Sequence, residues 1–391
     1  MRAPSRVWFL LLLQTGLVHA VTQLLRPTTS YRALEVGIGP AALGAISASF
    51  AVLPLFLAIG AGRFTDRGGE RRSLLLGAGL VVASAVAFVT VADSLPALLA
   101  CSALLGLGHL LSMIGQQSLV ASLHDARRYD TAFGNYTFAG SVGQTAGPAL
   151  VAALGGTATI PDTQRMFIGS LVVAAAVLVT TIALPRSAPR PRSSGSGGSV
   201  AETLRVPGLW RPIMASLFVI AAVDLLVVYL PALGTERGIA SGVVGLLLAV
   251  RAAASMLSRL LLASMARLVG RDRLLSASIW ASAACIGLLP VPMPLAAMVV
   301  VVAFAGLALG IGQPLTMSWV VRAVPAHVRA TALGLRLTGN RLGQVAVPAT
   351  IGVLAASAGA AGVIWATAAT LAVAAAVSGG GGDGRAGPRR D

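Results

Sequence analysis

The chain has 391 residues, of which 56% are hydrophobic and 11% are charged, and its mean hydropathy is +0.84. Soluble domains carry about 25% charged residues, so a chain this apolar could not cover its own surface in water, and the composition excludes an ordinary soluble protein. The net charge of +16 would suggest a nucleic-acid partner in a soluble protein, but the 29 basic residues are all arginines and cluster in short segments between apolar runs, which is the topology pattern of a membrane protein.

The apolar runs predict the fold class. Each run has roughly 17–27 residues, and about 20 residues are enough to cross a bilayer. Because lipid offers the backbone no hydrogen bonds, every run is predicted to be a helix. We therefore expect an all-α polytopic membrane protein in a lipid bilayer, with twelve transmembrane helices at 7–25, 40–61, 73–92, 95–121, 133–155, 166–184, 211–233, 241–264, 274–290, 295–320, 333–357 and 360–378.

The first run allows a second interpretation. Arg2 and Arg6 are followed by the apolar stretch 7–13 and then by small residues near Ala20. This order is also typical of a secretory signal with its cleavage site. Cleavage would leave eleven spans and place the new N-terminus outside.

A dense charge cluster, residues 62–72, joins the second and third runs and is predicted to be a short cytoplasmic loop. Its simplest interpretation is a solvated turn with topogenic arginines. Its spacing, G-x-x-x-D-R-x-G-x-R-R, also resembles the loop between helices 2 and 3 of the major facilitator superfamily, although Glu70 stands where that family has a basic residue. The resemblance implies an inner latch between two halves that holds the outward-facing state. The implied gating residues are Gly62, Asp66, Arg67, Gly69, Arg71 and Arg72.

The geometry of the predicted helices suggests two contacts for this loop. The helix predicted at 333–357 starts on the inside, so Asp66 could dock at its N-terminus, where the helix dipole is positive. Arg67 or Arg71 could then pair with Asp125 or Asp130.

The fifth run carries a glycine motif. Gly143 and Gly147 are four residues apart and form a small-residue face that allows close helix packing, and Pro148 follows them. The motif resembles the G-x-x-x-G-P sequence of drug/proton antiporters in the same superfamily. The glycine pair that usually follows is replaced by Val151 and Ala152, so packing alone is the competing interpretation.

The chain contains an internal repeat. Residues 131–149 align without a gap to 331–349, with eight of nineteen positions identical. Because the copies are six spans apart, both run the same way through the membrane, and two parallel halves of six helices resemble the major facilitator arrangement. The expected organisation is a first half at 1–184, a Pro/Gly/Ser-rich cytoplasmic linker at 185–207, a second half at 208–378 and a disordered tail at 379–391.

The arginines predict the orientation. If both termini lie inside, the inner segments hold most of the 29 arginines, whereas the outer segments hold only Arg26, Arg32, Arg165 and Arg237. This bias predicts cytoplasmic termini in a multi-pass protein of the inner (plasma) membrane.

Asp224 is the only acid deep inside a predicted span. It lies about 14 Å below the outer end of its helix, and Arg251 lies about 15 Å below the outer end of the next one. Equal depth suggests an ion pair, which could be structural. Because unpaired intramembrane charges are costly, Asp224 is also a candidate for proton coupling or substrate binding, with Arg251 tuning it.

Other polar residues are candidates for the same site. Asn340, Arg341 and Gln344 form a polar face with Arg336, which we expect to snorkel to the cytoplasmic edge. Two arginines at a cavity could attract an anionic group. His19 and His109 lie near mid-depth and could take a proton or simply pack, and Gln144 adds a neutral hydrogen-bonding group.

Together these features predict a secondary transporter that exports a small organic molecule by proton antiport through alternating access. Uptake by symport or facilitation is the alternative, and a non-transporting membrane sensor is a remote one. The sequence contains no phosphate-binding loop and no metalloprotease motif that would indicate an enzyme. Cys101 and Cys285 are too far apart in the sequence to suggest a metal site. We expect no cofactor and no metal, and a protein that works as a monomer.

Overall fold

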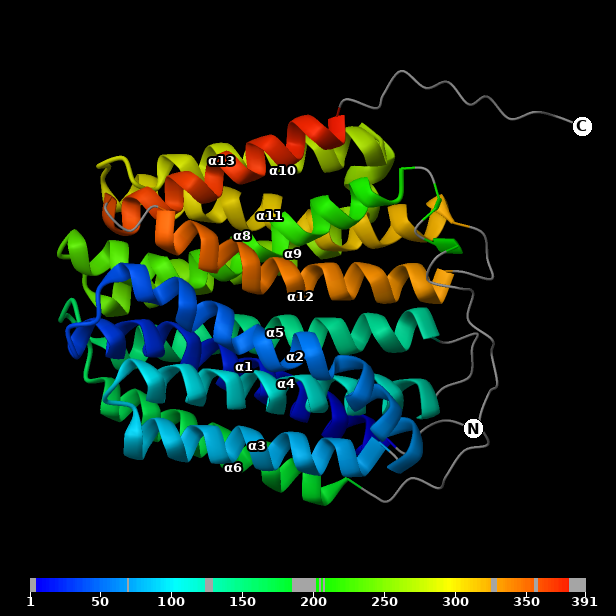
Figure 1. Cartoon of the computed structure of the whole chain (residues 1–391), viewed down its shortest axis with the longest axis horizontal. Coiled ribbons are helices and arrows are strands. Elements are labelled where there is room, and N and C mark those ends of the chain that lie inside the picture. The colour runs from blue at the N-terminus through cyan, green and yellow to red at the C-terminus, as the bar shows by residue number, and fades with distance from the viewer. Residues whose placement is uncertain are drawn as a thin grey trace, which may run out of the picture.

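A computed structural model gives the fold of the chain and describes residues 5–68, 70–123, 129–184, 202–203, 205–206, 208–324, 329–354 and 358–379. Over these residues the chain forms twelve long helices and no strand (Figure 1). The prediction of an all-helical protein is confirmed.

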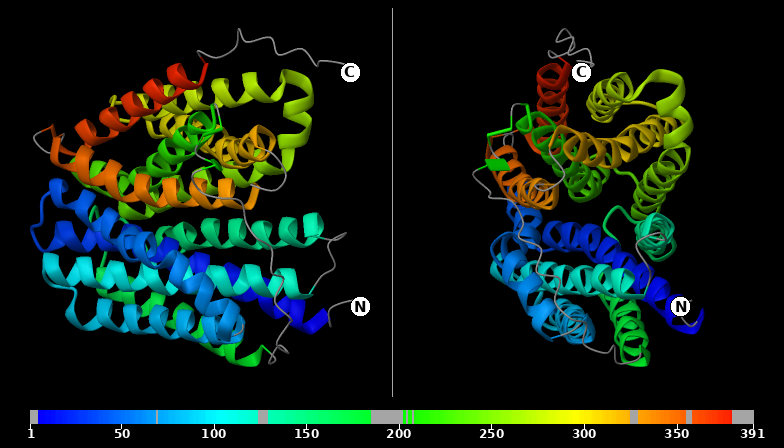
Figure 2. Two further views of the ribbon diagram at one scale, coloured as in Figure 1. Left: turned by 45° about the vertical axis from the view of Figure 1, so that its right-hand side comes forward. Right: turned by 90° about the vertical axis from the view of Figure 1, so that its right-hand side faces the viewer.

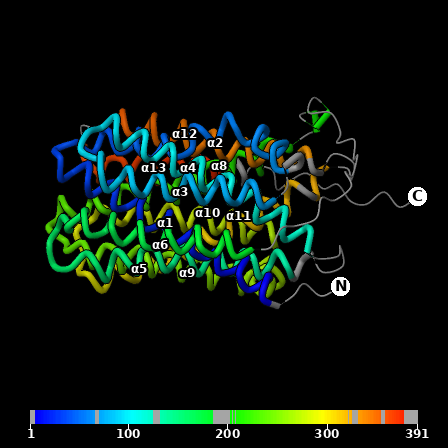
Figure 3. The backbone as a smooth tube through the Cα atoms, turned by 90° about the horizontal axis from the view of Figure 1, so that it is seen from below, coloured from blue at the N-terminus to red at the C-terminus, as the bar shows by residue number. Residues whose placement is uncertain are grey.

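The helices form two groups of six. The first group contains α1 (Ser5–Glu35), α2 (Pro40–Gly68), α3 (Glu70–Val91), α4 (Leu95–Leu123), α5 (Tyr129–Gly155) and α6 (Thr163–Ala183). The second contains α8 (Trp210–Glu236), α9 (Ser241–Val269), α10 (Arg271–Leu288), α11 (Leu295–Ala323), α12 (Arg329–Leu354) and α13 (Gly359–Gly379). Seen from below, the helices of both groups run along the same long axis (Figure 3).

Nine of the twelve described helices are long and apolar enough to cross a membrane, judged by length and composition. The others are α5, α10 and α12. The two copies of the repeat, α5 and α12, are less apolar because they carry polar residues, some of which line the cavity between the groups. Both pack across the boundary between the groups, α5 against α9 and α12 against α2.

Several helix ends differ from the prediction, most clearly those of α1, α2 and α3. The first helix was expected to stop at residue 25, but α1 continues through Pro27 to Glu35, so Arg26 lies inside the helix and is buried instead of lying in an outer loop. The stretch 62–72 was expected to be a loop, but α2 extends to Gly68 and α3 begins at Glu70. These helices continue through charged residues that lie beyond the apolar part of each span.

The two ends of the bundle are not equivalent. We call the end where α1 begins and α13 ends the terminal end, and the opposite one the far end (Figure 1). At the far end the groups are joined by polar contacts: the Tyr229 hydroxyl donates to the Pro40 carbonyl at 3.0 Å, and the Ser241 hydroxyl donates to the carbonyls of Gly155 at 2.7 Å and Ala158 at 2.8 Å.

The apolar core shows the same asymmetry. One large cluster contains buried residues from both groups, among them Leu43 and Tyr229 near the far end. At the terminal end each group has a separate small cluster, one around Leu74 and one around Val320. Over the described residues, the groups therefore meet over the far end and have separate apolar clusters at the terminal end, and Figure 2 shows them as two bodies.

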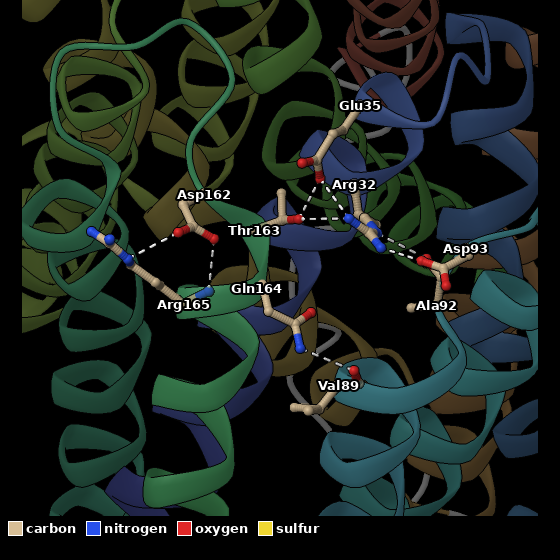
Figure 4. Close-up of polar contacts among 9 residues, drawn as sticks. All are labelled: Arg32, Glu35, Val89, Ala92, Asp93, Asp162, Thr163, Gln164 and Arg165. Carbon is tan, nitrogen blue, oxygen red and sulfur yellow. Dashed lines mark hydrogen bonds and ion pairs between the residues drawn. The ribbon is translucent and has the colours of Figure 1, made fainter.

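A polar cluster ties the first group together at its far end (Figure 4). Arg32 at the end of α1 forms ion pairs with Glu35, at 2.9 Å, and with Asp93 between α3 and α4. The hydroxyl of Thr163, the first residue of α6, donates to the same Glu35 carboxylate. The turn between α3 and α4 and the start of α6 are thus both linked to the end of α1.

Candidate substrate and proton site

A cavity of about 220 Å³ lies between the two groups of helices. Its walls come from both groups, and it brings together candidate residues of the two halves of the chain. The lining residues are His19, Thr22, Gln23, Arg26, Phe50, His109, Met113, Gln144, Ile220, Val223, Asp224, Arg251, Ser255, Arg259, Leu309, Gln313, Leu337, Asn340, Arg341 and Gln344.

Asp224 lies at the centre of the polar contacts in this cavity. It is 4% exposed, and each of its carboxylate oxygens has its own donor. Arg26 Nη1 donates to Oδ1 at 2.6 Å, and Gln344 Nε2 donates to Oδ2 at 2.6 Å. The Asp224 carboxylate on α8 therefore links α12 of its own group to α1 of the other group.

Arg26 is the functional candidate that the sequence analysis missed. Besides Asp224, its guanidinium contacts the Ser47 hydroxyl, with Nη2 to Oγ at 3.3 Å, and its Cζ lies 4.8 Å from the centre of the Phe50 ring. The predicted span ended at residue 25 because the apolar run stops there, just before Arg26 and Pro27. The next glycine after this proline is Gly37, which adopts a positive φ of 77° just after α1, and this turn residue was the signal for a longer helix.

Arg251 lies in the same cavity but does not form the expected ion pair with Asp224, which pairs with Arg26 instead. The equal depth of Asp224 and Arg251 correctly indicated that they share a cavity. It was wrong as an indication that they touch. Arg251 is 4% exposed, and its Nε atom has no hydrogen-bond partner in the described part of the chain.

The polar face of α12 turns toward α8 and α11. Arg341 Nη1 donates to Gln344 Oε1 at 3.0 Å, and the Ser216 hydroxyl donates to Asn340 Oδ1 at 2.7 Å. Arg336 does not snorkel: it is 5% exposed and its Nη2 donates to the side chain of Gln313, with a distance of 2.7 Å to Oε1. Because Gln313 on α11 supplies a buried acceptor, the Arg336 guanidinium does not have to reach the edge of the membrane.

The two candidate histidines are neighbours on the wall formed by the first group. Their ring centres are 5.3 Å apart in an edge-on arrangement. His19 Nδ1 lies 3.0 Å from the Thr15 carbonyl, so it donates there, and His109 Nδ1 lies 3.2 Å from the Thr22 hydroxyl. Both rings are therefore held in place on the cavity wall.

The glycines of the α5 motif allow α5 to approach α1 closely. A Cβ atom added at Gly143 would lie 2.0 Å from the Gly16 carbonyl oxygen, and one added at Gly147 would lie 2.7 Å from the Ala20 carbonyl oxygen. Pro148 lies inside the same helix, and Gln144, next to Gly143, lines the cavity. The motif thus has a packing role beside the cavity.

Part of the predicted gating motif can be placed. Arg71 donates from Nε to the Leu184 carbonyl at 3.1 Å and from Nη2 to the Ile182 carbonyl at 3.2 Å, so it stabilises the end of α6, where the helix dipole is negative. Gly62 lies on α2 and Arg72 is exposed.

The remaining parts of that prediction lie outside the described residues. These are Gly69, Asp125 and the side chains of Asp66, Arg67 and Asp130, together with most of the linker and the tail after residue 379.

Comparison with known proteins gives a family match and several structural neighbours. The family model described as the Major Facilitator Superfamily matches residues 11–240 and 213–379. No curated protein sequence matches the chain.

Solved structures that resemble the chain include several transporters. A variant of the nucleoside transporter NupG has a TM-score of 0.77 at 14% identity, covering 95% of this chain and 98% of that one. A D-xylose–proton symporter has a TM-score of 0.77 at 16% identity, with 96% and 97% covered. A bacterial homologue of the human lysosomal transporter Spinster, in an inward-facing and occupied conformation, has a TM-score of 0.74 at 17% identity, with 96% of each chain covered. At these identities the likeness shows the fold.

Proposed function

The chain belongs to the major facilitator superfamily, a family of transporters and not of enzymes, and from this premise we propose that it is a proton-coupled transporter of a small organic molecule. The cavity between the two groups binds the molecule, and rocking of the groups opens it at one end at a time. The chain spans the plasma membrane with both termini in the cytoplasm, an orientation supported by its arginine distribution, and it works as a monomer.

The observation that carries the proposal is the ion pair between Arg26 and Asp224, which joins the two groups inside the cavity. Protonation of Asp224 removes the negative charge that holds Arg26, and it leaves the Gln344 amide with a weaker acceptor. A proton therefore changes a contact between the moving bodies, which is the requirement for coupling it to alternating access.

The same pair favours cotransport of proton and substrate. When Asp224 is protonated, the donors of Arg26 and Gln344 become free for acceptor atoms of the substrate, so the proton and the substrate bind best together. An inward proton gradient then drives uptake, which is the symport alternative of the sequence analysis.

Export by proton antiport, the direction favoured by the sequence, is the second candidate. Its support is the α5 motif, since Gly143 and Gly147 hold α5 against the part of α1 that carries His19 and Gln23. Antiport requires that the proton and the substrate compete, and protonation of His19 or His109 on this wall would exclude a cationic substrate.

Transport into proteoliposomes with an imposed pH gradient tests the proposal. The wild type is expected to move at least one compound of a panel of sugars, nucleosides, organic acids and drug-like cations against its concentration gradient. The Asp224→Asn variant is expected to lose this accumulation but to keep exchange at equal concentrations, because the uncharged side chain retains its shape.

The Asp93→Asn variant is the matched control, since Asp93 lies in an ion pair outside the cavity and its side chain is 69% exposed. Accumulation by Asp224→Asn equal to that of the wild type would refute the coupling role of Asp224. Equilibration alone by the wild type would indicate a facilitator, and no movement of any compound would favour the sensor.

A further inference from the structure

The charge of the cavity indicates what it binds. Four arginines line it, Arg26, Arg251, Arg259 and Arg341, and only one carboxylate, Asp224, so with neutral histidines its formal charge is +3. Charges buried away from water are costly unless counter-charges balance them. A cavity with this excess has a high energy when it is empty and repels cations.

Arg251 differs from the other three arginines. Arg26 pairs with Asp224, Arg259 Nη1 donates to the Ser141 hydroxyl at 3.0 Å, and Arg341 donates to Gln344. Arg251 is 4% exposed and more deeply buried than Arg259 and Arg341, which are partly exposed, yet its Nε atom has no partner in the described part of the chain. A guanidinium with free donors matches the two oxygens of a carboxylate or a phosphate.

We propose that the substrate is a small organic anion and that Arg251 is its principal binding residue, with Arg26 and Arg341 as the other positive groups of the site. The anionic group is a carboxylate, a phosphate monoester or a sulfonate. The cavity volume of about 220 Å³ lies below the roughly 300–1,000 Å³ of pockets for drug-sized ligands, so the molecule is small.

This inference rests on the proposed function and deepens it. An anion that contacts Arg26 competes with the Asp224 carboxylate for the same guanidinium. Binding of the anion therefore makes protonation of Asp224 more favourable, and the proton and the anion move in the same direction. The positive cavity thus favours symport over exchange with protons.

The test is binding by the purified full-length protein, measured as the shift of its unfolding temperature at constant ionic strength. The anionic probes are lactate, benzoate, glycerol 3-phosphate and methanesulfonate, and the uncharged and cationic probes are glycerol, xylose and tetramethylammonium. At least one anion is expected to stabilise the wild type, and Arg251→Gln is expected to weaken its binding at least about tenfold, because a hydrogen bond to a charged group is lost.

Two further variants keep the result interpretable. Arg251→Lys retains the charge and is expected to recover part of the affinity, whereas Arg165→Gln, which alters an arginine whose side chain is 80% exposed at the far end, leaves it unchanged. The unfolding temperatures without ligand check that each variant is folded.

Three results would overturn the inference: no anion stabilises the wild type, only uncharged or cationic probes do so, or Arg251→Gln binds the anion as tightly as the wild type. Transport assays separate this failure from that of the proposed function. Proton-driven accumulation of an uncharged molecule would support the proposed transport function and refute the inference that the substrate is an anion. Binding of an anion without any transport would support the anion site and refute the transport function.

Discussion

At the residue scale, the Arg26–Asp224 pair makes a prediction for stability. Both side chains are 6% exposed, so removing one charge leaves the other buried without its partner. Asp224→Asn and Arg26→Gln are each expected to lower the free energy of unfolding by about 3–5 kcal/mol, because an unpaired buried charge is costly. The double variant is expected to lose much less than the sum, and denaturant unfolding in detergent measures all four proteins.

Additive losses in this cycle, within about 0.5 kcal/mol, would contradict a direct contact between the two residues. A control cycle on Arg165 and Asp162 is expected to show little coupling, since their side chains are 80% and 49% exposed and surface pairs contribute roughly 0–1 kcal/mol.

The sequence could predict that Asp224, Arg251 and Arg341 lie in the cavity, but it did not predict Arg26 or Arg259 there, nor which of these residues touch. Asp224 and Arg251 stood out because charges inside apolar runs are rare, and both do line the cavity. Depth along a helix is one coordinate only. The contact of Asp224 with Arg26 also depends on how each helix is rotated and on how the two groups dock, which no local pattern encodes.

At the element scale, the contact between α1 and α5 predicts different effects for two glycines of one helix. Gly143→Ala is expected to destabilise the protein by about 1–3 kcal/mol, because the new methyl group would overlap the Gly16 carbonyl. Gly134→Ala adds a methyl group that meets nothing within 4 Å and is expected to be neutral or stabilising. Unfolding temperatures in detergent compare the two, and equal effects would show that the close approach is absent.

Helices were the part of the fold that the sequence predicted best, because apolar runs in lipid have no other way to satisfy their backbone groups. Helix ends were predicted less well. Pro27 lies within α1 and did not end it, and the charged residues near position 66 continue α2 to Gly68. In α1 the helix continues past its apolar stretch because the residues that follow find partners, as Arg26 does.

At the scale of the whole molecule, the asymmetry between the ends predicts a labelling pattern. In a background with Cys101 and Cys285 replaced by serine, Leu337→Cys is expected to react rapidly with a membrane-impermeant maleimide added at the terminal side, because Leu337 is 59% exposed on the cavity wall. Leu43→Cys is expected to react slowly from either side, because Leu43 is fully buried near the far end. Rapid labelling of Leu43→Cys alone would contradict closure there.

The sequence predicted the two groups of helices through the repeat of α5 in α12, but it could not predict which end is closed. A transporter sequence must be compatible with both states, so the contacts that separate them, such as that of Ser241 with Gly155, carry no distinctive pattern.

The direction of proton movement tests the central claim most directly. Proteoliposomes without a pH gradient would be given an inward gradient of a transported compound, and a trapped pH-sensitive dye would report the lumen. Symport through Asp224 predicts that the lumen of wild-type vesicles becomes acidic as the compound enters, whereas vesicles with Asp224→Asn show no change. A lumen that becomes alkaline would establish antiport, and entry of the compound into wild-type vesicles with no pH change would contradict proton coupling altogether.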